Sequence, residues 1–206
     1  MSRGKNNAKP ELLAPGGDEA QLIAAAEAGA DAVYFGLQNL NARRRARNFH
    51  PDELPKIVQR LHGFNAKAVL TLNTNLTHRE VGHAARILEA AREAGVDCVL
   101  VTDPALLLLR PSFPEIAFHW STQTAVTTSV GMKTALRFGI NRVVLPRELN
   151  LDEIKSATRV KNVETEVFVQ GALCFCVSGR CLLSSWGGGR SGNRGLCTSP
   201  CRVPWS

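Results

Sequence analysis

The chain has 206 residues, 44% of them hydrophobic, with a formal net charge of +7. This composition suits one globular domain and excludes a disordered or fibrous protein. No apolar run approaches the roughly 20 residues that span a bilayer, and the first residues lack the apolar core of a secretory signal. We therefore expect a cytoplasmic protein that makes no membrane contact, and the positive charge favours an anionic partner.

Seven short apolar runs alternate with longer segments of helical period. Most of the runs are apolar at every position, as expected for strands that are covered on both faces. Alternating strands and helices predict an α/β fold with a parallel sheet. The seven runs occupy residues 11–15, 30–37, 67–73, 96–103, 116–122, 142–148 and 165–171.

Helix-end signals mark several of the intervening segments. Asp18 is suited to cap a first helix, and Gly29 and Gly95 are suited to end two of the helices. These segments cover residues 18–30, 79–95 and 151–160.

Two architectures fit this alternation, a doubly wound open sheet and a closed barrel. A complete barrel needs eight strands, typically in about 250 residues, so a barrel here is truncated after strand seven. Its two unpaired edges would favour association with another chain. The sequence then divides into a disordered tail (1–10), βα units one to seven (11–171) and a cysteine-rich segment (172–206).

Polar residues follow the strands, where either architecture places its functional sites. Arg147 follows the sixth strand, and its guanidinium can hold a carboxylate or phosphate bidentately. Glu148 is a candidate general acid or base, or the ion-pair partner of Arg147. Each polar residue also fits a strand that simply emerges into solvent. The other candidates for substrate binding are Asn41, Arg43, Asn73, Ser121 and Gln123.

Residues 171–202 contain five of the six cysteines and four arginines, with no acidic residue. In a reducing compartment, clustered cysteines are typical of metal sites or catalytic thiols. The spacing C-x-C-x4-C-x15-C-x3-C matches neither a zinc ribbon nor a ferredoxin, so zinc, an iron-sulfur cluster and a redox dithiol all remain open. A buried structural thiol explains Cys98.

Two arginine-rich stretches could contact the phosphates of RNA. One is "RRRAR" at 43–47, and the other contains "GGGRSG" at 187–192, which follows no strand and is therefore not a dinucleotide site. Neither H-E-x-x-H nor G-x-S-x-G is present, so the motifs do not support a peptidase. The candidate RNA contacts are Arg44, Arg45, Arg190 and Arg194.

Long motifs in a fixed order carry a resemblance to a known family. They include "ELLAPGG", "GADAVYFG", "NARRRARNF", "RVVLPREL", "EVFVQGALC" and "GGRSGNRGLCTSPCR". From about residue 10 to the last residue, the chain resembles the amino-terminal part of the collagenase-like peptidase U32 family. The resemblance implies a TIM-like barrel whose cysteine segment follows strand seven.

The resemblance also implies a function. Members of the family are oxygen-independent hydroxylases that carry a 4Fe-4S cluster; some modify a cytidine of ribosomal RNA or a uridine of transfer RNA with prephenate as a co-substrate, and others act on the ubiquinone ring. "GRSGNRGLC" is most similar to the ribosomal-RNA branch. A collagenase-like peptidase and a non-catalytic metal-binding fragment are the alternatives. The motifs imply four cluster ligands and leave Cys176 out: Cys174, Cys181, Cys197 and Cys201.

Overall fold

The computed structural model describes residues 9–171 and 174–204. All seven expected strands are present, and every neighbouring pair in the sheet is parallel. Most of the expected disordered tail, residues 1–8, lies outside the described residues. The strands are β1 (Leu13–Pro15), β2 (Ala32–Gly36), β3 (Lys67–Leu72), β4 (Cys98–Val101), β5 (Ala117–Trp120), β6 (Arg142–Val144) and β7 (Glu164–Glu166).

Helices connect the strands, and short caps set their ends. Asp18 caps α1 by accepting a hydrogen bond from the Gln21 amide, and Gly95 ends α3 in the left-handed region at φ 77°. The helices are α1 (Glu19–Glu27), α2 (Leu54–Gly63), α3 (Val81–Ala94), α4 (Pro104–Leu109), α5 (Ser129–Arg137), α6 (Leu151–Thr158) and α7 (Leu183–Gly188).

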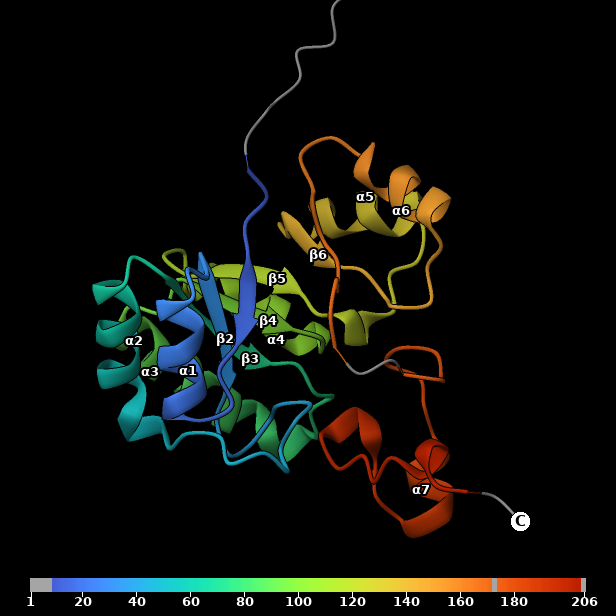
Figure 1. Cartoon of the computed structure of the whole chain (residues 1–206), viewed down its shortest axis with the longest axis horizontal. Helices are drawn as coiled ribbons and strands as arrows, with labels where there is room; N and C mark the ends of the chain where they lie inside the picture. The colour runs from blue at the N-terminus through green and yellow to red at the C-terminus, as the bar shows by residue number, and fades with distance from the viewer. Residues whose placement is uncertain (1–8, 172–173, 205–206) are drawn as a thin grey trace, which may run out of the picture.

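The strand order settles the choice between the two architectures. The strands lie side by side in chain order from β1 to β7, without the reversal that a doubly wound sheet contains. Figure 1 shows this sheet curling, with α1, α2 and α3 packed outside it. The fold is therefore a TIM-like half-barrel, and within the described residues no strand joins β7 to β1.

Two apolar clusters explain why the strands are apolar at every position. The larger cluster lies between the strands and the helices and includes Val33, Val99 and Phe118. A smaller cluster lines the inner face of the curled sheet with alternate residues of the same strands, including Cys98 and Leu100. Side chains on both faces of β4 are buried, so no polar alternation marks this strand in the sequence.

Candidate functional site

Hydrogen bonds join the loops that follow β2, β3 and β5. The Asn73 side chain accepts from the Ala42 amide at 2.9 Å and donates to the Ser121 hydroxyl at 3.1 Å. Buried Asn41 accepts from the Arg43 amide at 2.7 Å and donates to the Leu37 carbonyl. Three of the predicted substrate-binding residues therefore build the carboxyl-end rim of the barrel, which we define as the loops that directly follow the strands.

Other polar atoms at this rim are buried without a hydrogen-bond partner. In the described parts of the chain, four buried side-chain atoms have this property: Thr102 Oγ1, Thr122 Oγ1, Gln123 Oε1 and Arg147 Nε. All four follow β4, β5 or β6 directly. A buried polar group without a partner costs free energy, so each of these atoms at the rim is available to a polar ligand.

Arg147 is held above an aromatic ring. Its guanidinium carbon lies 3.7 Å from the centre of the Phe168 ring, which is a cation-π contact. Burial and the nearby Arg43 guanidinium lower the pKa of Arg147, although the group stays charged. The electrostatic influence of Cys174 on Arg147 places this cation beside the cysteine segment. A half-buried cation with another cation nearby is suited to bind an anion.

Glu148 has a structural partner that the sequence did not reveal. Its two carboxylate oxygens accept from the Ser178 amide and hydroxyl, each at 2.9 Å. Ser178 belongs to the cysteine segment and is buried. Glu148 therefore attaches this segment to the loop after β6.

The cysteine segment packs closely against the rim at two glycines. Gly179 has φ 72°, and a Cβ added there would lie 1.9 Å from the Gln123 carbonyl oxygen. Gly195 has φ 78°, and a Cβ there would lie 2.2 Å from the Asn41 carbonyl oxygen. Both the left-handed conformation and the close backbone approach require glycine at these positions.

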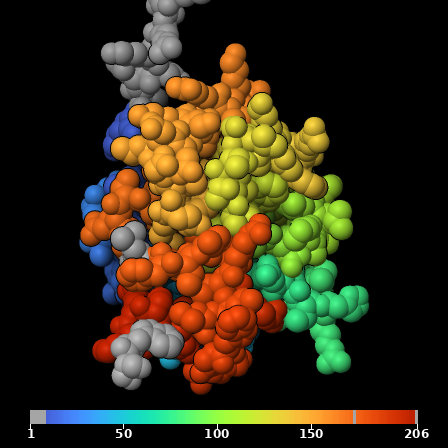
Figure 2. Space-filling view, turned by 90° about the vertical axis from the view of Figure 1, so that its right-hand side faces the viewer, coloured from blue at the N-terminus to red at the C-terminus, as the bar shows by residue number. Residues whose placement is uncertain are grey.

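Arg194 adds a bidentate ion pair to this attachment. Its two terminal nitrogens lie 3.0 and 2.7 Å from the oxygens of Glu80, and one of them also donates to the Asn75 carbonyl at 2.7 Å. The hydrogen bond from Arg194 holds the pKa of Glu80 at about 2. Figure 2 shows the segment, in orange and red, lying beside the green residues that follow β3. The predicted RNA contact of Arg194 remains a prediction, and its charge is already paired.

The cysteines of the segment divide into two environments. The hydrogen bond between Cys176 and Cys181 raises the pKa of the Cys176 thiol. The charges of Cys174 and Cys201 raise this pKa as well. Burial opposes ionisation of Cys197, but hydrogen bonds from Ser199 and Ser184 lower the pKa of its thiol.

All six cysteines are free thiols. Among residues 9–171 and 174–204, no three His, Cys, Asp or Glu side chains are grouped as metal ligands. The chemistry of the donors still fits an iron-sulfur cluster, because thiolates are its protein ligands. The four implied ligands remain a prediction.

The remaining candidate RNA contacts are exposed. Arg44, Arg45 and Arg190 all lie on the surface, and one Arg45 terminal nitrogen reaches the Cys197 carbonyl oxygen at 3.5 Å. Arg44 packs against Gly195, where an added Cβ would lie 2.8 Å from its own Cβ. The two arginine-rich stretches, far apart in the sequence, therefore meet at one edge of the rim.

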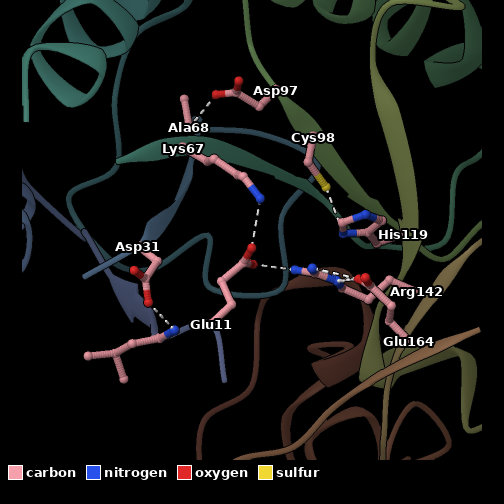
Figure 3. A network of polar contacts seen from close by, with 10 residues as sticks. Glu11, Asp31, Lys67, Ala68, Asp97, Cys98, His119, Arg142 and Glu164 are labelled. Atoms are coloured by element: carbon pink, nitrogen blue, oxygen red, sulfur yellow. Dashed lines mark hydrogen bonds and ion pairs between the residues drawn. The ribbon is translucent and has the colours of Figure 1, made fainter. Parts of the chain in front are cut away.

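The opposite end of the barrel carries a network of paired charges, shown in Figure 3. Glu11 accepts from Lys67 at 2.7 Å and from Arg142, and Arg142 also binds Glu164 at 2.6 Å. The bond from Arg142 is the main cause that lowers the pKa of Glu11 to about 2. Because Glu11 precedes β1 and Arg142 begins β6, this network connects the two sides of the curled sheet.

A cysteine and a histidine meet inside the barrel near this network. Cys98 Sγ and His119 Nδ1 lie 2.9 Å apart, and both residues are buried. Burial raises the pKa of the Cys98 thiol and lowers that of His119 to about 4. Both groups are therefore neutral near pH 7, unlike the thiolate-imidazolium pair of a cysteine peptidase.

Sequence reasoning missed three residues of the rim. Thr102 and Thr122 have the same position, directly after a strand, as the candidates that it did select. Phe168 follows the last residue of β7 by two positions and was assigned to the strand. The signal was present for the threonines, whereas the contact between Phe168 and Arg147 depends on tertiary structure.

Comparison with known proteins adds three findings. Residues 17–206 match the family model described as "Peptidase family U32". "23S rRNA 5-hydroxycytidine C2501 synthase" of Escherichia coli (strain K12) is 39% identical over 95% of this chain and 30% of that protein. "tRNA hydroxylation protein P" of the same strain is 37% identical over 94% of this chain and 43% of that protein. The chain thus spans less than half the length of these two curated relatives.

A solved structure, "The Structure of the U32 Peptidase Mk0906", is similar in fold. It superposes with a TM-score of 0.66 at 17% sequence identity, and the match covers 85% of this chain and 74% of that one. This likeness supports the TIM-like architecture. In the described part of the chain, no helix is both long and apolar enough to cross a membrane.

Proposed function

The chain belongs to peptidase family U32, and from this premise we propose that it is part of an oxygen-independent iron-sulfur hydroxylase that acts on a pyrimidine of RNA. The proposed substrate is a cytidine of ribosomal RNA or a uridine of transfer RNA, with prephenate as the small anionic co-substrate. Two curated relatives whose names state RNA hydroxylation or hydroxycytidine synthesis support the reaction.

The four unpartnered polar atoms at the rim are the observation that carries the proposal. Arg147 Nε is a donor, Gln123 Oε1 is an acceptor, and the hydroxyls of Thr102 and Thr122 can be either. A small molecule that carries both a carboxylate and a hydroxyl group would satisfy this set. The Arg147 guanidinium, which lies over the Phe168 ring, would bind the carboxylate.

The cysteine segment would supply ligands for the proposed cluster, and the influence of Cys174 on Arg147 places this segment beside the cation. Cys174, Cys181, Cys197 and Cys201 would hold it, and when bound it would provide electron transfer or a Lewis-acidic iron. Glu148, through Ser178, and Arg194, through Glu80, fix the segment on the rim. The protein's own residues would thereby orient the co-substrate beside the cluster.

RNA would lie against the exposed arginines at the edge of the rim. Arg44, Arg45 and Arg190 are exposed in a region where residues 171–202 contribute no negative charge. The target base would leave its stack to enter the rim, as in other enzymes that modify a base. Phosphate contacts by arginine position the RNA without reading its sequence.

The buried pair Cys98 and His119 weighs against the alternative of a cysteine peptidase. This pair is neutral and has no access to a peptide from the rim, because it lies inside the barrel among apolar side chains. A peptidase needs a nucleophile that is activated by a charged or basic partner. Hydroxylation of the ubiquinone ring is the remaining alternative.

Mass spectrometry of nucleosides from a deletion strain tests the proposed reaction. We expect one hydroxylated pyrimidine to disappear from ribosomal or transfer RNA and to return when the intact gene is restored. Unchanged RNA nucleosides together with a loss of ubiquinone would support the quinone alternative. Release of peptides from collagen by the purified protein would support the peptidase.

Anaerobic reconstitution tests the cluster independently. Iron and sulfide analysis should give about four of each per chain for a 4Fe-4S centre. Cys181→Ser should lose the cluster, whereas Cys98→Ser should retain it because Cys98 lies inside the barrel. Cys176→Ser should also retain it, because Cys176 is outside the implied ligand set although it contacts Cys181. Full loading of Cys181→Ser would contradict the assignment.

A further inference from the structure

Trp186, an exposed aromatic residue in the cysteine segment, makes no ring-ring or cation-π contact with the described residues. Trp186 is 84% exposed, whereas the core aromatics Phe35 and Phe118 are each 2% exposed. Leaving a large aromatic side chain in water forgoes roughly 1.5–3 kcal/mol of burial free energy. Exposed tryptophan is typical of binding surfaces, where the indole provides a large rigid contact area.

The three residues that follow Trp186 are glycines, which have no side chains. Gly187, Gly188 and Gly189 follow Trp186, and a Cβ added at any of them would meet no heavy atom of the described chain within 4 Å. Gly189 ends α7 with φ 66°, and exposed Arg190 comes next. The three residues after Trp186 therefore place no side chain on this exposed surface, and the next side chain along the chain is a guanidinium.

Hydrogen bonds fix the segment that carries the indole. The buried Ser184 hydroxyl accepts from the Thr198 amide at 3.2 Å, and the Ser184 carbonyl accepts from the Arg190 amide at 3.2 Å. Ser184 also donates to Cys197 at 3.7 Å. The surface is thus preorganised, which lowers the entropic cost of binding.

The charge of the surroundings identifies the ligand. Residues 171–202 contain arginine and no acidic residue, and the Arg45 contact with Cys197 ties the segment to the arginine-rich loop after β2. A tryptophan beside arginines is the combination that binds unpaired nucleotides, whose bases stack on the ring while cations hold the phosphates. Bases of a duplex are already stacked on one another and leave no face for the indole.

We propose that Trp186, Gly187–Gly189 and Arg190 form a stacking site for one unpaired nucleobase of the RNA, outside the base that is modified. The inference rests on the proposed function, because it takes RNA as the substrate. It adds that the substrate region is single-stranded and that recognition includes a base at α7.

Fluorescence of the full-length protein tests this site. Trp186 is one of three tryptophans in this chain, so its emission is measured as the difference between the full-length protein and its Trp186→Phe variant. A single-stranded RNA of about twelve nucleotides should quench this emission, and the same RNA in a duplex should not. In the free protein the emission should be that of a solvent-exposed indole.

Binding measurements on matched variants complete the test. Trp186→Ala should weaken single-stranded RNA binding about 5- to 100-fold, the loss expected for one stacked base. Trp186→Phe should retain most of the affinity, because a phenyl ring still offers a face on which a base can stack. Leu108→Ala is the control, because Leu108 is equally exposed at 84% on α4.

Each contrary outcome would overturn a different part of the proposal. RNA binding that is unaffected by Trp186→Ala would remove the stacking site and leave the proposed function standing. Equal quenching by the duplex would overturn the preference for unpaired bases. A shielded indole in the free protein would show that another part of the protein covers this surface. No RNA binding by any variant, together with unchanged RNA nucleosides in the deletion strain, would overturn the proposed function as well.

Discussion

The two ends of the barrel differ in whether their charged groups are paired. At the amino ends of the strands, Arg142 binds Glu11 and Glu164, and Lys67 binds Glu11. At the carboxyl ends, Arg147 has a buried nitrogen without a partner among the described residues, and after burial the largest influence on its pKa is the charge of another arginine. Paired charges hold one end together, and unpaired groups at the other end are available to a ligand.

This contrast separates residues that stabilise the fold from residues that could bind. In barrels of this type, the carboxyl end carries the active site and the opposite end contributes stability. The amino-end network connects the segment before β1 to β6 and so helps to hold the two sides of the curled sheet together. Substitutions at the two ends should therefore change different measurements.

The largest effect should come from detaching the cysteine segment. Gly195→Ala places a methyl group 2.2 Å from the Asn41 carbonyl oxygen and requires a residue other than glycine at φ 78°. The conformation alone costs about 1–3 kcal/mol, so the segment should leave the rim while the half-barrel stays folded. Limited proteolysis should cleave within residues 171–202 much faster than in wild type.

Gly63→Ala is the matched control for this detachment. A Cβ at Gly63, the last residue of α2, meets no described atom within 4 Å, so cleavage should match wild type. Equal protease resistance of Gly195→Ala and Gly63→Ala would show that the segment does not depend on the close contact at Gly195.

The next effect concerns the cation at the carboxyl end. Arg147→Lys keeps the charge but loses the planar fork and its contact with Phe168, so we expect product formation to fall at least about 100-fold. Stability should change little, because no described ion pair is broken. RNA affinity and its dependence on salt should be unchanged, whereas Arg44→Ala should lower the log-log salt slope by about 0.7–0.9. A flattened salt slope in Arg147→Lys would place this residue on RNA.

The strands were predictable from the sequence, but their order was not. An apolar run such as residues 67–73 indicates a strand by its own composition, and the structure has a strand in each of the seven runs. The choice between a barrel and a doubly wound sheet depends on which strands are neighbours, a tertiary property that periodicity does not carry. The unpaired edges of the half-barrel, and any association through them, remain a prediction.

The structure places several of the predicted residues at the carboxyl-end rim, but what each side chain contacts there depends on residues distant in the sequence. Asn73 and Glu148 both follow strands, yet each is engaged by a partner that lies elsewhere in the sequence, Ser121 and Ser178. Spacing alone could not show that these side chains are occupied. It also could not show that the charge of Arg194 is paired with Glu80.

A smaller effect on stability should follow from the amino-end network. Arg142→Met leaves Glu11 with Lys67 alone and removes both bonds to the partly buried guanidinium. We expect the free energy of unfolding to fall by about 2 kcal/mol, less than for a fully buried pair. Urea unfolding measures this loss, and RNA affinity should not change. Lost RNA affinity at unchanged stability would contradict the separation of the two ends.

The smallest effect is a pH dependence that two groups near the network partly hide. Burial raises the pKa of Glu166 to about 7, so the folded state keeps this proton and stability falls as the pH rises from about 4.5 to 7. Burial lowers the pKa of His119 to about 4, so stability rises as the pH goes from about 4 to 6.5. Each slope is below about 1.4 kcal/mol per pH unit, and the two oppose each other where their ranges overlap.

Glu166→Gln should remove the decrease in stability with pH that Glu166 causes, so that the increase caused by His119 can be measured. The stability of wild type should change little between about pH 4.5 and 6.5 and then fall slightly toward pH 7, whereas the variant should become more stable up to about pH 6.5 and stay so. The carboxylates of Glu11 and Glu80, with pKa values of about 2, lose their contribution only below this range. Urea midpoints measured at half-unit steps of pH would show the difference. Parallel curves for the variant and wild type would mean that Glu166 is ionised in the folded protein, and that Arg142 already compensates its charge.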